Sequence, residues 1–160
     1  MRVTILAVGQ IRNSPEETLC RTYLERLAGP GRTIGIRDVT VREIAESRAG
    51  SAAARTAEEA RRLLAVVPGD AHVVLLHEAG RNMSSTELAA TLRARAEGGV
   101  RDLVFVIGGP DGHGAELEDR ADLVLSLGAM TWPHRLVRVL LAEQLYRAVT
   151  ILTNHPYHRA

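Results

Sequence analysis

Two apolar runs in the last third of the chain constrain its fold more than any other feature. They are Leu103–Ile107 and Leu123–Leu127, and each run ends directly in a loop that contains glycine. A strand as continuously apolar as the first is typical of a parallel sheet that helices cover on both faces. Open sheets of this kind bind ligands just beyond the carboxyl ends of their strands. The sequence therefore predicts two neighbouring ligand-binding loops at one edge of a parallel sheet.

The rest of the chain alternates short apolar runs with helix-like segments, which predicts an α/β layered fold. Strands are expected at Arg2–Val8, Thr33–Val39, Ala71–His77, Asp102–Ile107 and Asp122–Leu127. Helices are expected from Ser14 to about Ala28, where Gly29-Pro30-Gly31 would end the helix, and at Thr56–Val67, Ser84–Glu97, Ala115–Arg120 and Leu136–Leu152. The polar segment Arg42–Ala54 is expected to be a mobile loop. Because the chain contains no repeat or linker, residues 1–160 are expected to form a single domain.

Composition excludes several classes of protein. All 20 basic residues are arginine, so a phosphate-binding loop with its lysine and chemistry through a lysine Schiff base are both excluded. Cys20 is the only cysteine, and the pair His155-x-x-His158 lacks a clear third ligand, so no metal site is predicted. The net charge is +1, so any surface that binds nucleic acid must be local. No apolar run is long enough for a membrane span, and the N-terminal run fits a strand better than a signal peptide, so we expect a cytoplasmic protein.

The two loops after the apolar runs differ in the ligand that each would suit. Glycines in Gly108–Gly112 allow the backbone to approach a ligand closely. Their spacing does not match G-x-G-x-x-G, and no clear ribose-binding acid stands about 20 residues further on, which argues against a dinucleotide. The apolar loop Gly128–Pro133 offers backbone N–H and C=O groups within an apolar wall, which suits adenine. The alternative for each loop is a tightly packed connection that binds no ligand.

The last predicted helix and the tail after it carry further candidate residues. Glu143 and Arg147 stand four apart in the orientation that favours an ion pair, at a surface or at an interface. The helix is apolar nearly all round, which predicts burial against a partner and thus a homodimer. In the tail, Tyr157 is suited to stacking on a base and Arg159 to binding phosphate. The alternative for the tail is a solvated, disordered end.

Three segments of the chain carry a resemblance to a known family. They are IGGPDG, LSLGAMTWPHRLVRVLLAEQLYRA and the terminal NHPYHR, and the similarity extends to the opening VTILAVGQIR. These segments resemble the RlmH family of the SPOUT superfamily of RNA methyltransferases. The resemblance implies a parallel-sheet, three-layer SPOUT (α/β knot) fold with a C-terminal trefoil knot, a topology that general rules treat as exceptional. It also implies S-adenosylmethionine-dependent methylation of N3 of a pseudouridine in 23S ribosomal RNA, with no metal and with the ribosome as partner.

The resemblance and the chemistry of the side chains together assign roles to residues. The methyl donor is expected to contact Leu76, Gly109, Gly128, Ala129, Met130, Thr131, Trp132 and Pro133. Catalytic roles are expected for Arg138, which would stabilise a developing oxyanion, for His155, which would take the proton, and for Tyr157. RNA contacts are expected from His134, Arg147, His158 and Arg159. Two alternatives stay open: a SPOUT methyltransferase with another ribosomal or transfer RNA target, and a non-catalytic ribosome-binding module.

Overall fold

Within residues 1–157, which the computed structural model describes, five parallel strands form one sheet in the order β2-β1-β4-β3-β5. The strands are β1 (Arg2–Val8), β2 (Asp38–Ile44), β3 (His72–Asn82), β4 (Asp102–Ile107) and β5 (Leu123–Ser126). The helices are α1 (Pro15–Thr33), α2 (Ala52–Leu64), α3 (Ser85–Glu97), α4 (Ala115–Arg120) and α5 (His134–Leu152). The predicted α/β fold with a parallel sheet is therefore confirmed, and the trefoil knot stays a prediction.

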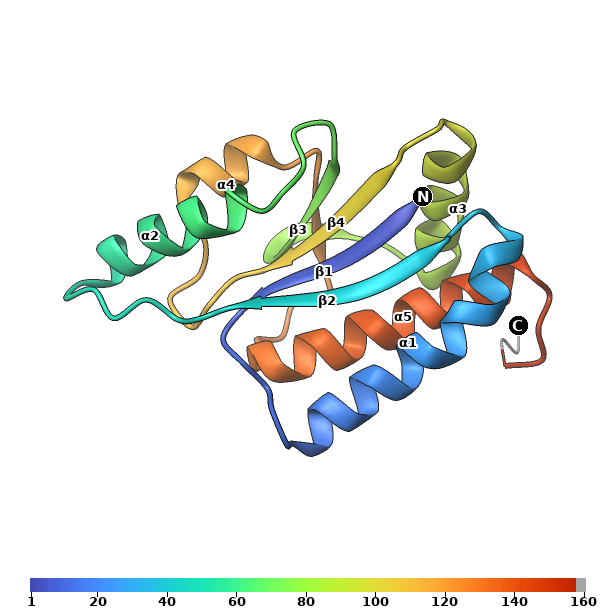
Figure 1. The fold of residues 1–160 in the computed structure, drawn as a ribbon, viewed down its shortest axis with the longest axis horizontal. Coiled ribbons are helices and arrows are strands. Elements are labelled where there is room, and N and C mark those ends of the chain that lie inside the picture. The colour runs from blue at the N-terminus through green and yellow to red at the C-terminus, as the bar shows by residue number, and fades with distance from the viewer. Residues whose placement is uncertain (158–160) are drawn as a thin grey trace.

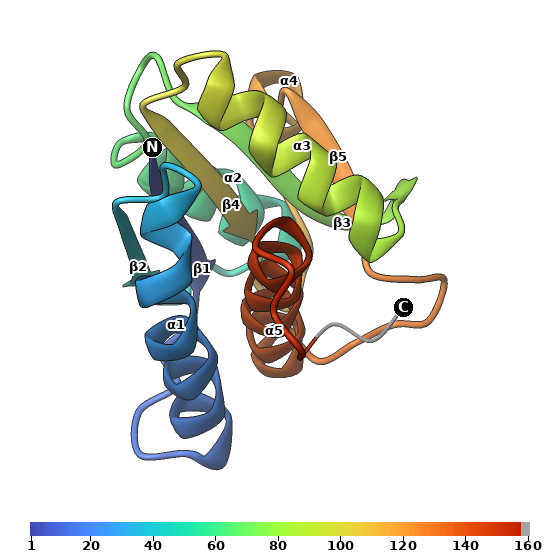
Figure 2. The same cartoon turned by 90° about the vertical axis from the view of Figure 1, so that its right-hand side faces the viewer.

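Helices cover both faces of the sheet, which gives the molecule three layers. Helices α1, α3 and α5 pack on one face, and α2 and α4 pack on the other (Figures 1 and 2). The side chains of β4 alternate between the two cores, since Phe105 lies in the first and Val104 and Val106 lie in the second. Every residue of β4 is buried, so the expectation of a strand covered on both faces is confirmed. None of the helices described here is long and apolar enough to cross a membrane.

The direction of the strands places two loops and one helix end at the same edge of the sheet. Strands β4 and β5 flank β3 and run parallel to it, so the carboxyl ends of all three lie together. Helix α5 begins at this edge and runs back for 19 residues, which is about 28 Å at a rise of about 1.5 Å per residue. The end of α5 and residues 153–157 after it therefore lie at the opposite end of the molecule (Figure 1).

Several local predictions are confirmed. Strands β1 and β4 and helix α4 have the predicted bounds. Helix α3 begins with a capping box at the predicted start, in which the backbone N–H of Glu87 donates to Ser84 Oγ (3.2 Å) and the backbone N–H of Ser84 donates to Glu87 Oε2 (2.7 Å). Both contacts satisfy amide groups that the first turn of a helix leaves without partners.

Helix α1 is longer than predicted. It continues through Gly29-Pro30-Gly31 and ends at Thr33, although a proline inside a helix costs about 3 kcal/mol. Tertiary packing overrides this local signal, since Gly31 is buried and a Cβ added there would lie 3.0 Å from Leu27 Cδ2. The strand predicted after this helix therefore starts later, and β2 begins at Asp38 rather than at Thr33.

The segment Arg42–Ala54 has more regular structure than a loop. Strand β2 extends into it from one side, and α2 begins at Ala52 rather than at Thr56. Between them, Ser47 is buried, and its backbone N–H donates to Glu59 Oε1 (2.8 Å). The expectation of a loop over the whole segment is therefore wrong at both ends.

Strand β3 is also longer than predicted. It ends at Asn82 rather than at His77, and its register against β5 shifts after Leu76. Gly80 lies in this stretch, and a Cβ added there would lie 2.7 Å from the carbonyl carbon of Leu125. The glycine thus allows β3 to continue in close contact with β5, where the sequence alone indicated a turn.

Candidate functional site

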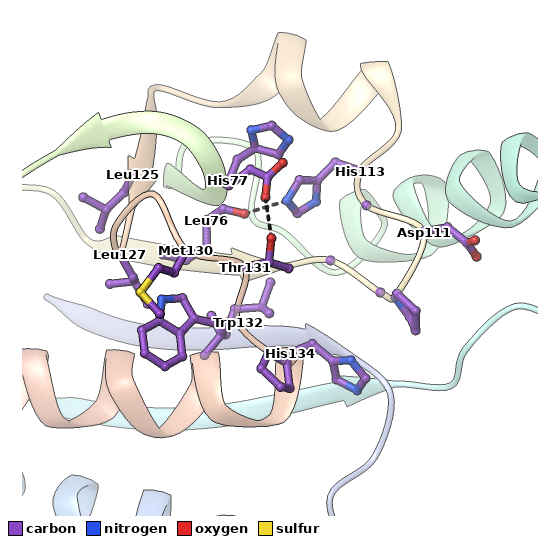
Figure 3. A pocket seen from close by; sticks show the side chains of 18 of the residues that line it. Leu76, His77, Asp111, His113, Leu125, Leu127, Met130, Thr131, Trp132 and His134 are labelled. Carbon is purple, nitrogen blue, oxygen red and sulfur yellow. Dashed lines mark hydrogen bonds between the residues drawn. The ribbon is translucent and has the colours of Figure 1, made fainter.

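A cavity of ≈ 760 Å³ lies at the edge of the sheet where the carboxyl ends of β3, β4 and β5 meet (Figure 3). The end of β3, the loop after β4, the loop that joins β5 to α5, and the start of α5 line it. Small-molecule sites commonly have volumes of about 300–1,000 Å³ and mostly apolar walls. The cavity therefore has the size of a cofactor site and lies where the strand directions predict a ligand.

The residues predicted to contact the methyl donor are brought together around this cavity. Leu76 lines it from the end of β3, and Gly109 lines it from the loop after β4. The loop after β5 contributes Gly128, Met130, Thr131, Trp132 and Pro133. Ala129 is the one residue of the predicted set that does not line the cavity. The structure thus shows that these residues are neighbours, and their role in binding a donor stays a prediction.

The loop after β4 is packed too closely to admit a side chain at Gly109. A Cβ added there would lie 2.8 Å from Glu59 Oε2 and 3.1 Å from Val8 Cγ1. The loop then turns back on itself, since the backbone N–H of Gly112 donates to Gly109 O (3.1 Å). Gly112 has a φ of +90°, in the left-handed region that favours glycine. This wall of the cavity therefore presents backbone atoms.

The loop after β5 forms a more apolar wall. Its turn is fixed by a hydrogen bond from the backbone N–H of Gly128 to Ser126 Oγ (3.1 Å), with Leu127 lining the cavity between them. Thr131 Oγ1 donates to Glu78 Oε2 (3.3 Å), which ties this loop to the end of β3 (Figure 3). The cavity thus combines backbone polar groups with apolar side chains, the combination that suits an adenine ring.

His113 is a cavity residue that sequence reasoning missed. Its Nε2 lies 2.6 Å from Leu76 O, and because a carbonyl only accepts, Nε2 must carry the proton and donate. Burial lowers the pKa of His113, and the contact with Leu76 opposes this effect only in part. The neutral ring therefore fixes the carbonyl at the end of β3. The sequence contains this histidine just past the glycine loop, but no spacing pattern marks it.

Arg138 is fully buried and is not among the residues that line the cavity. The side chain is 0% exposed. Its guanidinium donates to Val8 O (2.6 Å), Gly9 O (2.8 Å) and Glu43 Oε1 (2.6 Å). These acceptor groups stand at the carboxyl ends of β1 and β2. A second chain that bound here would not expose the Arg138 side chain, because association only buries further surface. Arg138 therefore holds α5 against the sheet, and its predicted role in stabilising charge on a substrate stays a prediction.

We expect Arg138→Ala to lower the free energy of unfolding by about 3 kcal/mol, because it leaves the Glu43 carboxylate and two buried carbonyls without their donor. Denaturant titration measures this change. The matched control is Arg135→Ala, on the same turn of α5 but exposed, which should change stability by less than about 0.5 kcal/mol. Equal stability of the two variants would contradict the assigned role of Arg138.

His134 lines the cavity at the start of α5. A Cβ added at Gly9 would lie 3.5 Å from His134 Nε2, so the ring stands between the cavity and the end of β1. Burial lowers the pKa of His134, and the positive charge of Arg138 adds to this effect, while Glu46 opposes it. The imidazole is therefore neutral at pH 7. Its predicted contact with RNA stays a prediction.

Residues 153–157 of the tail lie far from the cavity of their own chain. Tyr157 packs on α5, with its ring centroid 4.7 Å from that of Tyr146 and 5.1 Å from the guanidinium carbon of Arg147. Its hydroxyl donates to Glu143 Oε1 (3.0 Å), and burial, aided by this contact, raises the pKa of Tyr157 to about 12. His155 is adjacent, and its Nδ1 accepts the backbone N–H of Tyr157 (3.2 Å). Within one chain, neither predicted catalytic residue of the tail reaches the cavity.

The remaining candidates have mixed outcomes. The predicted ion pair is confirmed, since Arg147 Nη2 donates to Glu143 Oε1 (2.6 Å). The Arg147 side chain is 32% exposed, so part of its surface is open to RNA. His158 and Arg159 lie outside the described residues. Within residues 1–157, no three His, Cys, Asp or Glu side chains are grouped as metal ligands.

Comparisons with known proteins give the same family as the motifs. Residues 1–158 match a family model described as "Predicted SPOUT methyltransferase". The chain is 49% identical over 160 residues to "Ribosomal RNA large subunit methyltransferase H" of Allorhizobium ampelinum, and the match covers 100% of both chains. It is 48% identical to the protein of the same name in a Bradyrhizobium species, again over 100% of both chains.

Among solved structures, the chain is similar to the SpoU methyltransferase AviRb from Streptomyces viridochromogenes in complex with AdoMet. The TM-score is 0.41 at 14% identity, and the match covers 92% of this chain and 59% of that chain. The family assignment rests instead on the family model and on the full-length matches to the two relatives. These matches show that the chain belongs to the SPOUT methyltransferases, in the family of ribosomal RNA large subunit methyltransferase H.

Proposed function

We propose that this chain methylates N3 of a pseudouridine in 23S ribosomal RNA, with S-adenosylmethionine as methyl donor. The observation that carries the proposal is the cavity formed by Leu76, Gly109 and the Gly128–Pro133 loop in a chain of this family. Relatives that are 49% and 48% identical over their full length are named as methyltransferases of large-subunit ribosomal RNA. Full-length similarity of this degree supports the same class of reaction.

The residues around the cavity fit this donor. Bound S-adenosylmethionine supplies a methyl group on a positively charged sulfur, which is reactive without a metal. The backbone of Gly108–Gly112 and of the Gly128–Pro133 loop offers groups that read the edge of the adenine, and Leu127 and Val137 offer apolar surface for its faces. Met130 and Trp132 are 68% and 37% exposed, so they stand where they would cover a bound donor and exclude water.

The acceptor nitrogen of a pseudouridine carries a weakly acidic proton, which must leave before or during attack on the methyl group. His134 is a neutral imidazole that lines the cavity, and a neutral imidazole accepts a proton at pH 7. His113 is not available for this task, because its Nε2 is bonded to Leu76 O and its Nδ1 is buried. Within one chain, His134 is therefore a better candidate for the base than the distant His155.

A second chain would bring the tail to a cavity. The helix between His134 and Leu152 separates the two ends by about 28 Å, and we infer from this distance that the tail of one subunit serves the cavity of another. The apolar surface of α5 was the reason to predict a dimer. Much of this surface is covered by α1 and α3 of its own chain, so it supports the dimer only in part. Besides Leu19, Val41 and Val66, which lie in or after other elements, the large apolar residues left exposed within residues 1–157 are Met130, Trp132 and Leu136. They lie beside the cavity, so we infer a homodimer whose interface adjoins the cavity mouth.

We expect the purified protein to sediment as a dimer at micromolar concentration. Leu136→Glu should shift it towards a monomer, because the charge would be buried at the interface. The matched control is Val66→Glu, which places the same charge at another exposed apolar residue, next to α2 on the opposite face of the sheet. A monomer in the wild type, or a dimer unaffected by Leu136→Glu, would contradict the inferred interface.

Mapping the methylated nucleotide tests the proposed function. Ribosomes from a strain that lacks this gene are incubated with the protein and S-adenosylmethionine, and mass spectrometry locates the new methyl group. A methyl group on another ribosomal or transfer RNA nucleotide would favour the alternative target. If calorimetry shows no binding of S-adenosylmethionine while the protein still binds ribosomes, the chain is a ribosome-binding module instead.

A further inference from the structure

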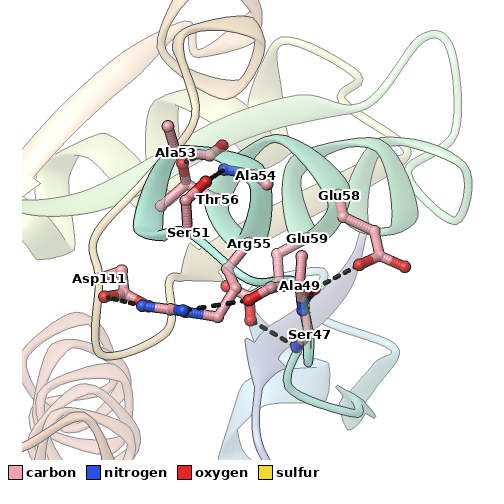
Figure 4. Close-up of polar contacts among 10 residues, drawn as sticks. All are labelled: Ser47, Ala49, Ser51, Ala53, Ala54, Arg55, Thr56, Glu58, Glu59 and Asp111. Atoms are coloured by element: carbon pink, nitrogen blue, oxygen red, sulfur yellow. Dashed lines mark hydrogen bonds and ion pairs between the residues drawn. The ribbon is translucent and has the colours of Figure 1, made fainter.

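The loop Gly108–Gly112, which we call the donor loop, lines the cavity with one face and rests on α2 with the other (Figure 4). The carboxylate of Asp111 accepts two hydrogen bonds from Arg55, one from Nε (2.7 Å) and one from Nη2 (3.0 Å). The remaining nitrogen, Nη1, donates to Ala49 O (3.1 Å). One arginine thus ties the donor loop both to α2 and to the segment that precedes α2.

A second side chain of α2 stands directly behind the donor loop. Glu59 is 4% exposed, and its Oε1 accepts the backbone N–H of Ser47 (2.8 Å). Its Oε2 has no hydrogen-bond partner within residues 1–157 and lies 2.8 Å from the place that a Cβ of Gly109 would occupy. Further along, a Cβ added at Gly114 would lie 2.9 Å from Ala60 Cβ. Helix α2 is therefore in close contact with both ends of the turn and supports it from behind.

We propose that Arg55 is a positioning residue for the methyl donor, acting through its ion pair with Asp111 to set the orientation of the donor loop. This inference rests on the proposed function, in which that loop holds S-adenosylmethionine. A bidentate pair of this kind fixes orientation as well as distance, which a single contact does not. The two side chains are only 31% and 28% exposed, so water screens the pair incompletely. The Arg55 guanidinium also holds the pKa of Asp111 below its usual range, so the carboxylate stays charged at neutral pH.

Arg55→Ala is expected to weaken binding of S-adenosylmethionine about ten-fold in calorimetry, the effect of losing about one charge-assisted hydrogen bond. The rate at saturating donor should stay close to that of the wild type, because Arg55 touches no reacting atom, so the change appears in KM for the donor and not in kcat. Arg61→Ala is the matched control. Arg61 lies on the same helix, and its Nε donates to Ala57 O of that helix (3.3 Å), so its removal should leave donor affinity unchanged.

Asp111→Asn gives an independent measurement, because it removes the acceptor charge without altering α2. We expect a similar loss of affinity, and the double variant should lose little more than either single variant, since both remove the same interaction. If Arg55→Ala does not fold, the loss in Asp111→Asn alone decides the matter. Wild-type affinity in the folded variants, or fully additive losses, would overturn the inference while the proposed function stands. A wild-type protein that binds no S-adenosylmethionine would overturn both.

Discussion

Replacing Gly109 with valine is expected to abolish binding of S-adenosylmethionine while the fold stays intact. The new Cβ would lie 2.8 Å from Glu59 Oε2 and 3.1 Å from Val8 Cγ1. Glu59 is buried and held by Ser47, and Val8 is part of β1, so neither neighbour can move away freely. The donor loop must shift into the cavity instead. Since overpacking costs about 1–3 kcal/mol and the two methyl groups add to the displacement, we expect affinity to fall by about 100-fold or more.

Calorimetry measures the affinity of this variant, and thermal unfolding shows whether the fold is kept. Gly50→Val is the matched control, because a Cβ added at Gly50 would meet nothing within 4 Å and the residue is exposed. It should bind the donor as the wild type does. If Gly109→Val is folded and retains wild-type affinity, the donor does not bind beside this loop, and the assignment of the cavity fails.

The convergence of loops at the cavity could be predicted because it follows from a single strong signal. The continuously apolar run of β4 indicates a parallel sheet, and parallel strands bring their carboxyl ends to one edge. Gly109 and the Gly128–Pro133 loop are then expected at that edge, whereas the place of Leu76 beside them was implied by the family resemblance. The bounds of β4 and the start of α3 could also be predicted, since each depends on residues that are adjacent in sequence.

The roles of side chains were harder to predict because they depend on contacts between distant segments. Arg138 stands between two valines in a largely apolar helix, and its spacing does not reveal that Val8 O, Gly9 O and Glu43, from the first third of the chain, accept its hydrogen bonds. The predicted end of α1 was wrong for a similar reason. Gly31 packs against Leu27, and this contact lets the helix continue through the glycine–proline sequence. Local patterns describe one segment at a time and do not show what it packs against.

The length of α5 predicts that the tail affects catalysis but not donor binding. Deleting His155–Ala160 is expected to leave donor affinity within a few-fold of the wild type, because the cavity lies at the other end of the helix. Methylation of ribosomes should fall by about 100-fold or more, because a substrate base that is not held in line with the methyl group reacts far more slowly. Tyr157→Phe is the control for stability, since it keeps the ring against Tyr146 and loses only the contact of the hydroxyl with Glu143.

Mixing two inactive variants decides whether the tail acts in the partner's cavity. In a mixed dimer, the subunit with the deleted tail keeps an intact cavity, and the Gly109→Val subunit keeps an intact tail. If the tail crosses to the partner, each mixed dimer has one complete site, and random mixing should restore about a quarter of wild-type activity, since half of the symmetric dimers are mixed and each has one site of two. If the tail serves its own chain, every mixed dimer lacks a complete site and no activity returns. Restored activity would therefore place His155 and Tyr157 of one subunit at the methyl donor of the other.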